Sequence, residues 1–116
     1  MAPNPYLEIT VEALAQRLAE AEPGTLQLID VREPQEAEIV SLEGFELLPL
    51  SQAQQWAGQV RDRFNPTTET LVLCHHGLRS AQMCQWLASQ GFTQVKNISG
   101  GIDAYARRID SALALY

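Results

Sequence analysis

Residues 70–90 read TLVLCHHGLRSAQMCQWLASQ, and the changes of pattern within this stretch decide the fold. The apolar run at 70–73 predicts a short buried strand. The segment 74–79 is polar and contains a glycine, which predicts a loop. Over residues 80–90 apolar side chains recur at helical spacing, and Gly91 is suited to end that helix. A strand that passes through a loop into a helix is the repeating unit of α/β domains with a parallel sheet.

The rest of the chain shows the same alternation. Thr10 precedes an apolar stripe of helical spacing and is the predicted N-cap of a first helix. The segment 33–46 is rich in glutamate, and we interpret it as a short helix or loop with a solvated acidic face, followed by a turn at Gly44. Further strands are predicted at 26–31, 45–48 and 95–98, and further helices at 51–64, with Ser51 as N-cap, and at 102–109. This order indicates an α/β domain with a mostly parallel central sheet, in which ligands bind beyond the carboxyl ends of the strands.

Length and charge narrow the class of protein. A chain of 116 residues with 46% hydrophobic residues is expected to form one domain over residues 1–116, with a core at about 9–109 and a C-terminal tail at 110–116. Eight basic residues against fourteen acidic ones give a net charge of −6, which disfavours nucleic acid and anionic membranes as partners. The first residues lack the basic segment and apolar run of a secretory signal, so we expect a soluble, cytoplasmic protein with free cysteines.

Cys74 is the strongest candidate for a catalytic residue. A loop between a strand end and a helix start directs backbone N–H groups inward, and the helix dipole adds positive potential there. Such surroundings favour the nucleophilic thiolate form of a cysteine. A buried cysteine at an ordinary turn is the alternative, but Gly77 lets the backbone curl and Arg79 offers a planar cationic donor to an oxyanion. We therefore predict an anion-binding loop around a reactive thiol. The loop is completed by His75, His76, Leu78 and Ser80.

The two histidines have two possible roles. His75 and His76 titrate near neutral pH and could act as acid-base groups or raise the local positive potential. Alternatively, they contribute only backbone amides while their side chains point to solvent. A metal site with Cys74 and Cys84 is disfavoured, because adjacent histidine side chains are expected to diverge and Cys84 is expected to face the core. No metal ion and no cofactor is therefore expected.

Asp30 and Arg32 lie two residues apart at the end of the strand predicted at 26–31, so they project on the same side. We expect a supporting role, in which Asp30 hydrogen-bonds the loop backbone or an arginine. The alternative is a surface ion pair, which contributes little to stability. Arg32 could also face the mouth of the site and attract an anionic donor.

These motifs resemble those of a known family. Residues 28–34, LIDVREP, and 73–81, LCHHGLRSA, are similar to the early strand and turn and to the active-site loop of single-domain rhodaneses. Residues 100–105, GGIDAY, are similar to the closing part of that family, and the resemblance runs in order from about residue 9 to 109. The tail at 110–116 lacks the prolines common in the family.

The resemblance implies a fold and an activity. The fold is a three-layer α/β domain with a central, mostly parallel five-stranded sheet flanked by helices. The activity is sulfur transfer, in which Cys74 carries sulfane sulfur as a persulfide. The donor is a small sulfur-containing anion such as thiosulfate, and the acceptor is a thiophilic compound, which includes a thiol or a protein.

Two other functions share this scaffold. One is a non-catalytic module that binds a partner, and the presence of Cys74, Gly77 and Arg79 argues against it. The other is a cysteine-dependent phosphatase or arsenate reductase. Those enzymes resemble this chain but place five residues between cysteine and arginine, whereas four lie between Cys74 and Arg79. The smaller loop is expected to crowd a tetrahedral phosphoryl group, so the sequence favours sulfur transfer.

Overall fold

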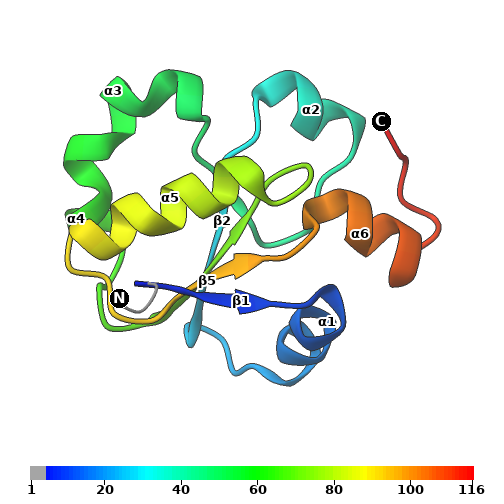
Figure 1. Ribbon diagram of the computed structural model, residues 1–116, viewed down its shortest axis with the longest axis horizontal. Coiled ribbons are helices and arrows are strands. Elements are labelled where there is room, and N and C mark those ends of the chain that lie inside the picture. Colours follow the sequence, from blue (N-terminus) through cyan, green and yellow to red (C-terminus); the bar gives the residue numbers. More distant parts are fainter. Residues whose placement is uncertain (1–4) are drawn as a thin grey trace.

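The central sheet of the computed structural model, which describes residues 5–116, has five strands that all run parallel (Figure 1). The strands are β1 Leu7–Ile9, β2 Leu26–Asp30, β3 Glu46–Leu47, β4 Glu69–Leu73 and β5 Val95–Ile98. Their order across the sheet is β1-β5-β4-β2-β3. The predicted α/β class and five-stranded parallel sheet are confirmed. Local patterns had not located β1, which is only three residues long.

Helices cover both faces of the sheet and make three layers (Figure 1). Helices α1 and α6 lie on one face, and α3, α4 and α5 lie on the other. Their bounds are α1 Val11–Glu20, α2 Pro34–Ile39, α3 Ala53–Trp56, α4 Val60–Arg63, α5 Leu78–Ser89 and α6 Gly101–Arg108, with 3₁₀ turns η1 Leu50–Gln52 and η2 Ala57–Gln59. Within the described residues, no helix is both long and apolar enough to span a membrane.

The start of α1 and the ends of α5 and α6 agree with the sequence signals to within two residues. The Thr10 side chain accepts a hydrogen bond from Ala13 N at 3.1 Å, as expected of an N-cap. Gly91, with φ at +97°, follows α5 as predicted. Helix α5 begins at Leu78 rather than at Ser80. The early start places Leu78 and Arg79 in the first helical turn, and the helical backbone therefore sets the direction in which the Arg79 side chain leaves the loop.

The single helix predicted over residues 51–64 is wrong. This segment winds as η1, α3, η2 and α4 in succession. Ser51 is not an N-cap, because its hydroxyl and backbone N–H both donate to the Glu33 carboxylate. Gly58 lies in the middle of the segment, and glycine weakens a helix there. The apolar side chains that recur every four residues in this segment are nevertheless all buried, and they are Trp56, Val60 and Phe64.

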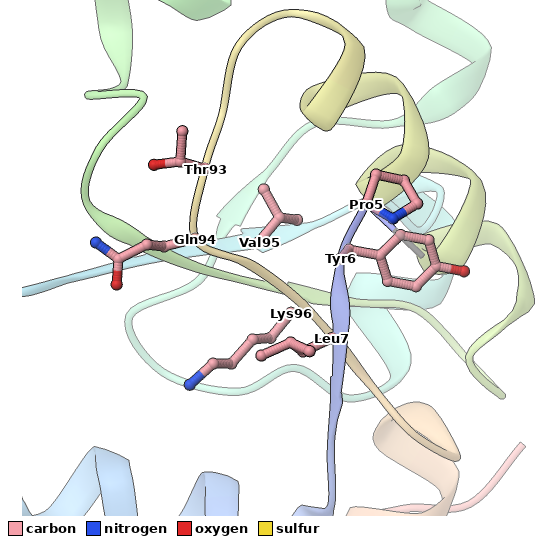
Figure 2. Close-up of a pocket in the computed structure, with 7 residues that line it drawn as sticks. All are labelled: Pro5, Tyr6, Leu7, Thr93, Gln94, Val95 and Lys96. Carbon is pink, nitrogen blue, oxygen red and sulfur yellow. The ribbon is translucent and has the colours of Figure 1, made fainter. Parts of the chain in front are cut away.

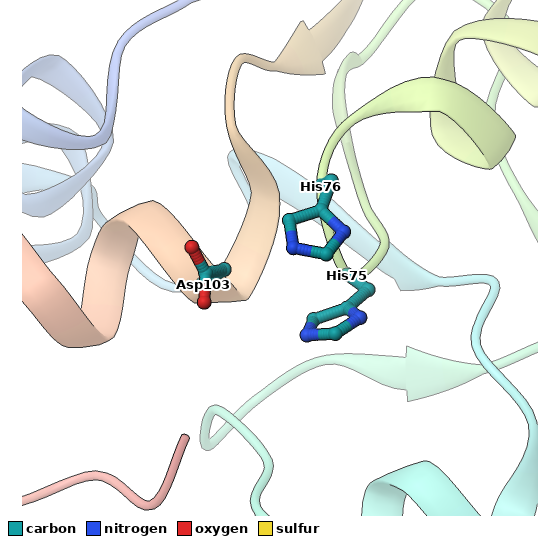
Figure 3. Close-up of side chains that lie close together, drawn as sticks. All are labelled: His75, His76 and Asp103. Atoms are coloured by element: carbon teal, nitrogen blue, oxygen red, sulfur yellow. The ribbon is translucent and has the colours of Figure 1, made fainter. Parts of the chain in front are cut away.

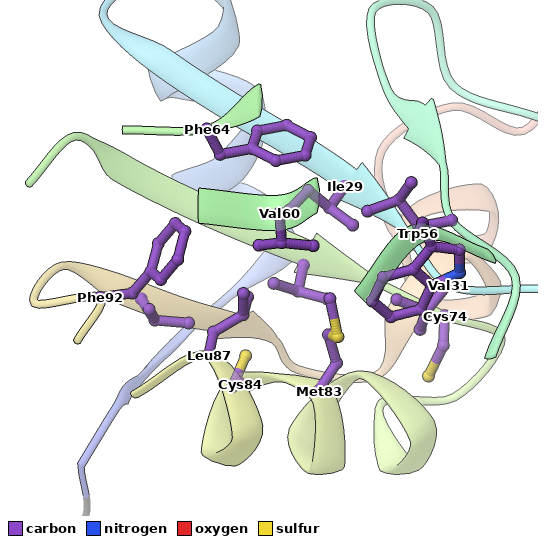
Figure 4. Close-up of a cluster of buried hydrophobic side chains, with 13 residues drawn as sticks. Ile29, Val31, Trp56, Val60, Phe64, Cys74, Met83, Cys84, Leu87 and Phe92 are labelled. Atoms are coloured by element: carbon purple, nitrogen blue, oxygen red, sulfur yellow. The ribbon is translucent and has the colours of Figure 1, made fainter. Parts of the chain in front are cut away.

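A buried cluster fills the space between the sheet and helices α3, α4 and α5 (Figure 4). Cys84 is fully buried in this cluster, beside Met83 and Leu87. Burial raises the pKa of the Cys84 thiol, which keeps it protonated and unreactive at neutral pH. Cys84 is therefore a packing residue, as predicted. A second cluster on the opposite face of the sheet includes Leu14 and Ile102 from α1 and α6.

Candidate active site

Cys74 follows β4 directly and is 1% exposed. Its Sγ accepts hydrogen bonds from Gly77 N at 3.0 Å and from Ser80 Oγ at 3.2 Å. Gly77 has φ at +102°, a left-handed conformation that favours glycine. Leu78, in contrast, turns its side chain to solvent and is 78% exposed. The structure thus brings two predicted loop residues to the sulfur atom and leaves Leu78 at the rim.

Asn97 on β5 orients these donors, and it was not predicted. Its Oδ1 accepts a hydrogen bond from Ser80 Oγ, and its Nδ2 donates to Gly77 O at 3.1 Å. A hydroxyl has one proton, so Ser80 can donate either to Asn97 or to Cys74 Sγ. As the sulfur gains negative charge, the proton is attracted toward Sγ. A polar residue inside the apolar strand at 95–98 was the available signal, because a buried amide needs partners.

Helix α6 holds the loop from behind. Two amides in the first turn of this helix, Ile102 N and Asp103 N, donate to Cys74 O at 2.9 Å and to His75 O at 3.1 Å. The approach is so close that a Cβ on Gly101 would lie 2.4 Å from both carbonyl oxygens. Gly101 also has φ at +63°. The glycine therefore permits the contact that fixes the Cys74 backbone.

Arg79 forms a two-point ion pair with Glu36 of α2. Arg79 Nη1 and Nη2 donate to Glu36 Oε1 and Oε2 at 2.6 and 2.8 Å. The hydrogen bonds lower the pKa of Glu36 from its ordinary 4.5 to about 2 and raise that of Arg79. Glu36 occupies two of the five guanidinium N–H groups, and the Arg79 side chain is 35% exposed, so it can still bind an anion. The prediction of a solvated acidic face is therefore wrong for Glu36.

Protonation of Glu36, which occurs only in acid, is expected to remove the stability that its ion pair with Arg79 provides. Because the folded-state pKa is lowered, the ion pair contributes fully above pH 4.5, and this contribution is lost as the pH falls toward about 2. Glu36→Gln should lower the free energy of unfolding in urea by about 1–3 kcal/mol at neutral pH, and the difference from wild type should shrink across that window. Glu38→Gln, on the exposed side of the same helix, is the matched control and should change little. A Glu36→Gln difference that stays constant down to pH 2 would contradict the prediction.

Asp30 and Arg32 form an interior ion pair. Arg32 is fully buried, and its Nε and Nη2 donate to the Asp30 carboxylate at 2.8–3.1 Å. Its Nη1 donates to Glu36 O at 3.3 Å and to Tyr116 Oη at 3.1 Å. A surface ion pair and an Arg32 that faces the open mouth of the site are both wrong, because the guanidinium is enclosed. The pair instead connects β2 with α2 and the C-terminal tail.

The rings of His75 and His76 were predicted to diverge, but in the structure they lie against each other. Their centroids lie 3.8 Å apart with an interplanar angle of 34° (Figure 3). The Tyr116 ring stacks on His75 at 3.8 Å and 5°. Burial lowers the pKa of His75, which favours its neutral form, whereas His76 is exposed to solvent. His75 is thus part of a packed wall beside Cys74, and only His76 presents its ring to solvent.

His75, His76 and Asp103 place potential metal-ligating atoms within 4.8 Å of one another (Figure 3). A ring nitrogen coordinates in the plane of its ring, and the two imidazole planes differ by only 34°, so their lone pairs run more nearly side by side than toward a common point. Asp103 is also paired with Arg107 at 3.0 Å. We therefore assign no metal site to this cluster.

A cavity of about 400 Å³ lies at the amino end of β5 (Figure 2). Tyr6, Val95 and Lys96 are among the residues that line it, and Lys96 Nζ is paired with Glu69 at 2.8 Å. Because all strands are parallel, their amino ends lie at the opposite edge of the sheet from Cys74. The lining contains no cysteine or histidine, so Cys74 and this cavity are separate features.

The fold and the loop define a class of protein: an α/β domain in which a loop at the carboxyl edge of a parallel sheet surrounds a cysteine and directs hydrogen-bond donors at its sulfur atom. Within that class, the family model of the rhodanese-like domain matches residues 10–108. The chain belongs to the rhodanese-like family, as its motifs predicted.

Its relatives include proteins named as sulfurtransferases. The chain is 45% identical over 114 residues to the rhodanese-like/PpiC domain-containing protein 12, chloroplastic, of Arabidopsis thaliana, and the match covers 97% of this chain but 38% of that protein. It is 32% identical over 106 residues to the thiosulfate sulfurtransferase GlpE of Vibrio cholerae, with 88% and 90% of the two chains covered. The crystal structure of a rhodanese-like domain protein from Staphylococcus aureus matches with a TM-score of 0.75 and 25% identity over 95% and 98% of the two chains.

Proposed function

We propose that the protein is a sulfurtransferase of the thiosulfate type, in which Cys74 carries the transferred sulfur. In the first half-reaction the Cys74 thiolate attacks the outer sulfur of thiosulfate. A new S–S bond forms, the S–S bond of thiosulfate breaks, and sulfite leaves with the bonding electron pair. In the second half-reaction a thiophilic acceptor takes the outer sulfur, and the thiolate is restored. This sequence of steps requires no oxidant, reductant or cofactor.

The observation that carries the proposal is the set of donors at Cys74 Sγ. Gly77 N–H and the Ser80 hydroxyl both reach the sulfur. The free N–H groups in the first turn of α5 add positive potential at the same place. A persulfide places its terminal, anionic sulfur one bond beyond Sγ, so donors of the same loop can stabilise it. These donors support both the attacking thiolate and the persulfide.

Mass spectrometry of the full chain tests the proposal. Protein treated with thiosulfate and freed of excess reagent should carry one additional sulfur on the Cys74 peptide. Cyanide should remove that sulfur and form an equal amount of thiocyanate. A Cys74 that reacts with an alkylating reagent but gains no sulfur would overturn the proposal. Hydrolysis of an aryl phosphate by that protein would then favour the phosphatase alternative, and neither activity would favour a partner-binding module.

Arg79→Ala is expected to slow sulfur loading from thiosulfate by about 30- to 150-fold. This corresponds to about 2–3 kcal/mol of transition-state binding, lost with the charge-assisted hydrogen bonds to the donor. Arg79→Lys should recover only part of the rate, because an ammonium group lacks the planar donor fork. Single-turnover release of sulfite measures this step directly.

The Arg79 variant needs two controls. Arg79→Ala removes the cation that is paired with the Glu36 carboxylate, so the double variant with Glu36→Gln removes the remaining negative charge as well. The double variant should remain slow. Full recovery in the double variant would mean that repulsion by Glu36, and not the loss of Arg79, caused the defect. Arg61→Ala, at an exposed position of α4, should react as the wild type does.

A further inference from the structure

The C-terminal tail returns from α6 to the active-site loop. After α6 ends at Arg108, the chain turns, and Leu113 N donates to Asp110 O at 3.1 Å. The Leu113 side chain packs against the buried cluster under α1 and α6. Tyr116 then lies beside α2 (Figure 1).

The Tyr116 side chain contacts three parts of the site at once. Its ring stacks on His75, the residue next to the nucleophile, at a centroid distance of 3.8 Å. Its hydroxyl oxygen accepts a hydrogen bond from Arg32 Nη1 at 3.1 Å and donates to Glu36 Oε2 at 2.8 Å. Burial raises the pKa of the phenol, so it remains a donor at neutral pH. One side chain therefore joins the end of β2, helix α2 and the loop after β4.

The hydrogen bond to Glu36 extends this influence to Arg79. Glu36 Oε2 accepts from both Tyr116 Oη and Arg79 Nη2, and Oε1 accepts from Arg79 Nη1. Glu36 Oε1 also accepts from Glu33 N at 3.0 Å. With these partners the carboxylate has one orientation, and that orientation sets the plane of the Arg79 guanidinium. Removal of the phenol leaves Oε2 held by Arg79 alone.

We propose that Tyr116 is a positioning residue for sulfur loading: it acts through Glu36 on Arg79 and through ring stacking on His75. This inference rests on the proposed function. It assigns to the C-terminal tail a role in binding the anionic donor. Tyr116 does not touch Cys74, so the tail is not required for the chemistry of the acceptor step with a small nucleophile.

Separate measurement of the two half-reactions tests this role. Tyr116→Phe removes only the hydroxyl and should slow loading from thiosulfate by about tenfold at low donor concentration. Tyr116→Ala also removes the stacked ring and should slow loading further. Release of sulfur from the preloaded protein to cyanide should stay within about twofold of wild type in both variants. Faster loading in Tyr116→Ala would overturn the proposal, because it would mean that the tail obstructs the donor.

A second measurement does not depend on sulfur transfer. Iodoacetate and iodoacetamide alkylate a thiol through similar geometry, but only iodoacetate is an anion. The ratio of their rates at Cys74 therefore reports how well the site positions an anion. Tyr116→Phe should lower this ratio by about three- to tenfold, and unchanged circular dichroism should show that the variant is folded.

Leu115→Ala is the matched control, because Leu115 precedes Tyr116 and is half exposed. It should leave both the loading rate and the alkylation ratio unchanged. An equal loss in Leu115→Ala would overturn the assignment to Tyr116. Wild-type values in Tyr116→Phe for both measurements would also overturn it, while sulfur loading by the wild type would keep the proposed function. If the wild type gains no sulfur, the proposed function fails, and the alkylation ratio alone decides whether Tyr116 positions an anion.

Discussion

Replacement of Cys74 with serine is expected to abolish sulfur loading, with a rate loss of about 10⁴-fold or more. Serine has nearly the same shape, and its hydroxyl can still meet the donors Gly77 N and Ser80 Oγ. A hydroxyl is not ionised at neutral pH, however, and Gly77 N and Ser80 Oγ, the hydrogen-bond partners that the described residues offer at this position, cannot act as a general base. The variant should release no sulfite from thiosulfate in a single turnover, and its mass should remain that of the unmodified chain.

Cys84→Ala is the matched control, because Cys84 is the second of the two cysteines in the chain. Its thiol is fully buried in the core, so truncation should cost about 1 kcal/mol of stability and leave the loading rate within about twofold. If sulfur were found on Cys84 in the Cys74→Ser protein, the assignment of Cys74 as the nucleophile would be wrong.

Gly101→Ala is expected to destabilise the protein by about 2–4 kcal/mol and to disrupt the active-site loop. The new Cβ would lie 2.4 Å from Cys74 O and from His75 O, and φ at +63° is unfavourable for alanine. Both oxygens belong to backbone carbonyl groups, so they can move away from the new Cβ only if the loop backbone moves with them. The melting temperature should fall by about 10 °C or more, and folded protein at lower temperature should load sulfur slowly.

Gly58→Ala separates this clash from a general effect of added methyl groups. Gly58 lies in a helical turn, its φ is not positive, and a Cβ there meets no atom within 4 Å. This variant should be as stable as the wild type or gain up to about 1 kcal/mol, because alanine favours helix. Wild-type stability in Gly101→Ala would show that α6 does not hold the loop as tightly as its hydrogen bonds indicate.

Predictions based on contiguous patterns were largely confirmed. The apolar run before Cys74 forms β4, and the periodic segment after the loop forms α5. The prediction of one continuous helix over residues 51–64 was wrong, because the segment alternates between 3₁₀ and α turns. The spacing of apolar residues indicates which side chains face inward, but not whether each turn is α or 3₁₀. Strand β1 was missed because three residues are too few to establish a pattern.

Some site residues carry a local structural signal in the sequence. Glu36 forms a capping box with Glu33 at the start of α2, and this spacing marks a helix start. The Gly100-Gly101 pair indicates a close backbone approach, although not which backbone approaches. Tyr116 carried no comparable signal, since the tail has no periodic pattern.

The sequence by itself determined the order of the elements apart from β1 and the segment 51–64, the alternation that favours a parallel sheet, and the position of Cys74 at the end of a strand. These features depend on residues that are near one another along the chain, where propensity and hydrophobic spacing act. Only the tertiary structure decided which side chains meet at that strand end. Glu36 is 43 residues from Arg79 and 80 from Tyr116, and Ser80 is 17 from Asn97. Such contacts are set by how the strands and helices pack in three dimensions, which no local pattern encodes.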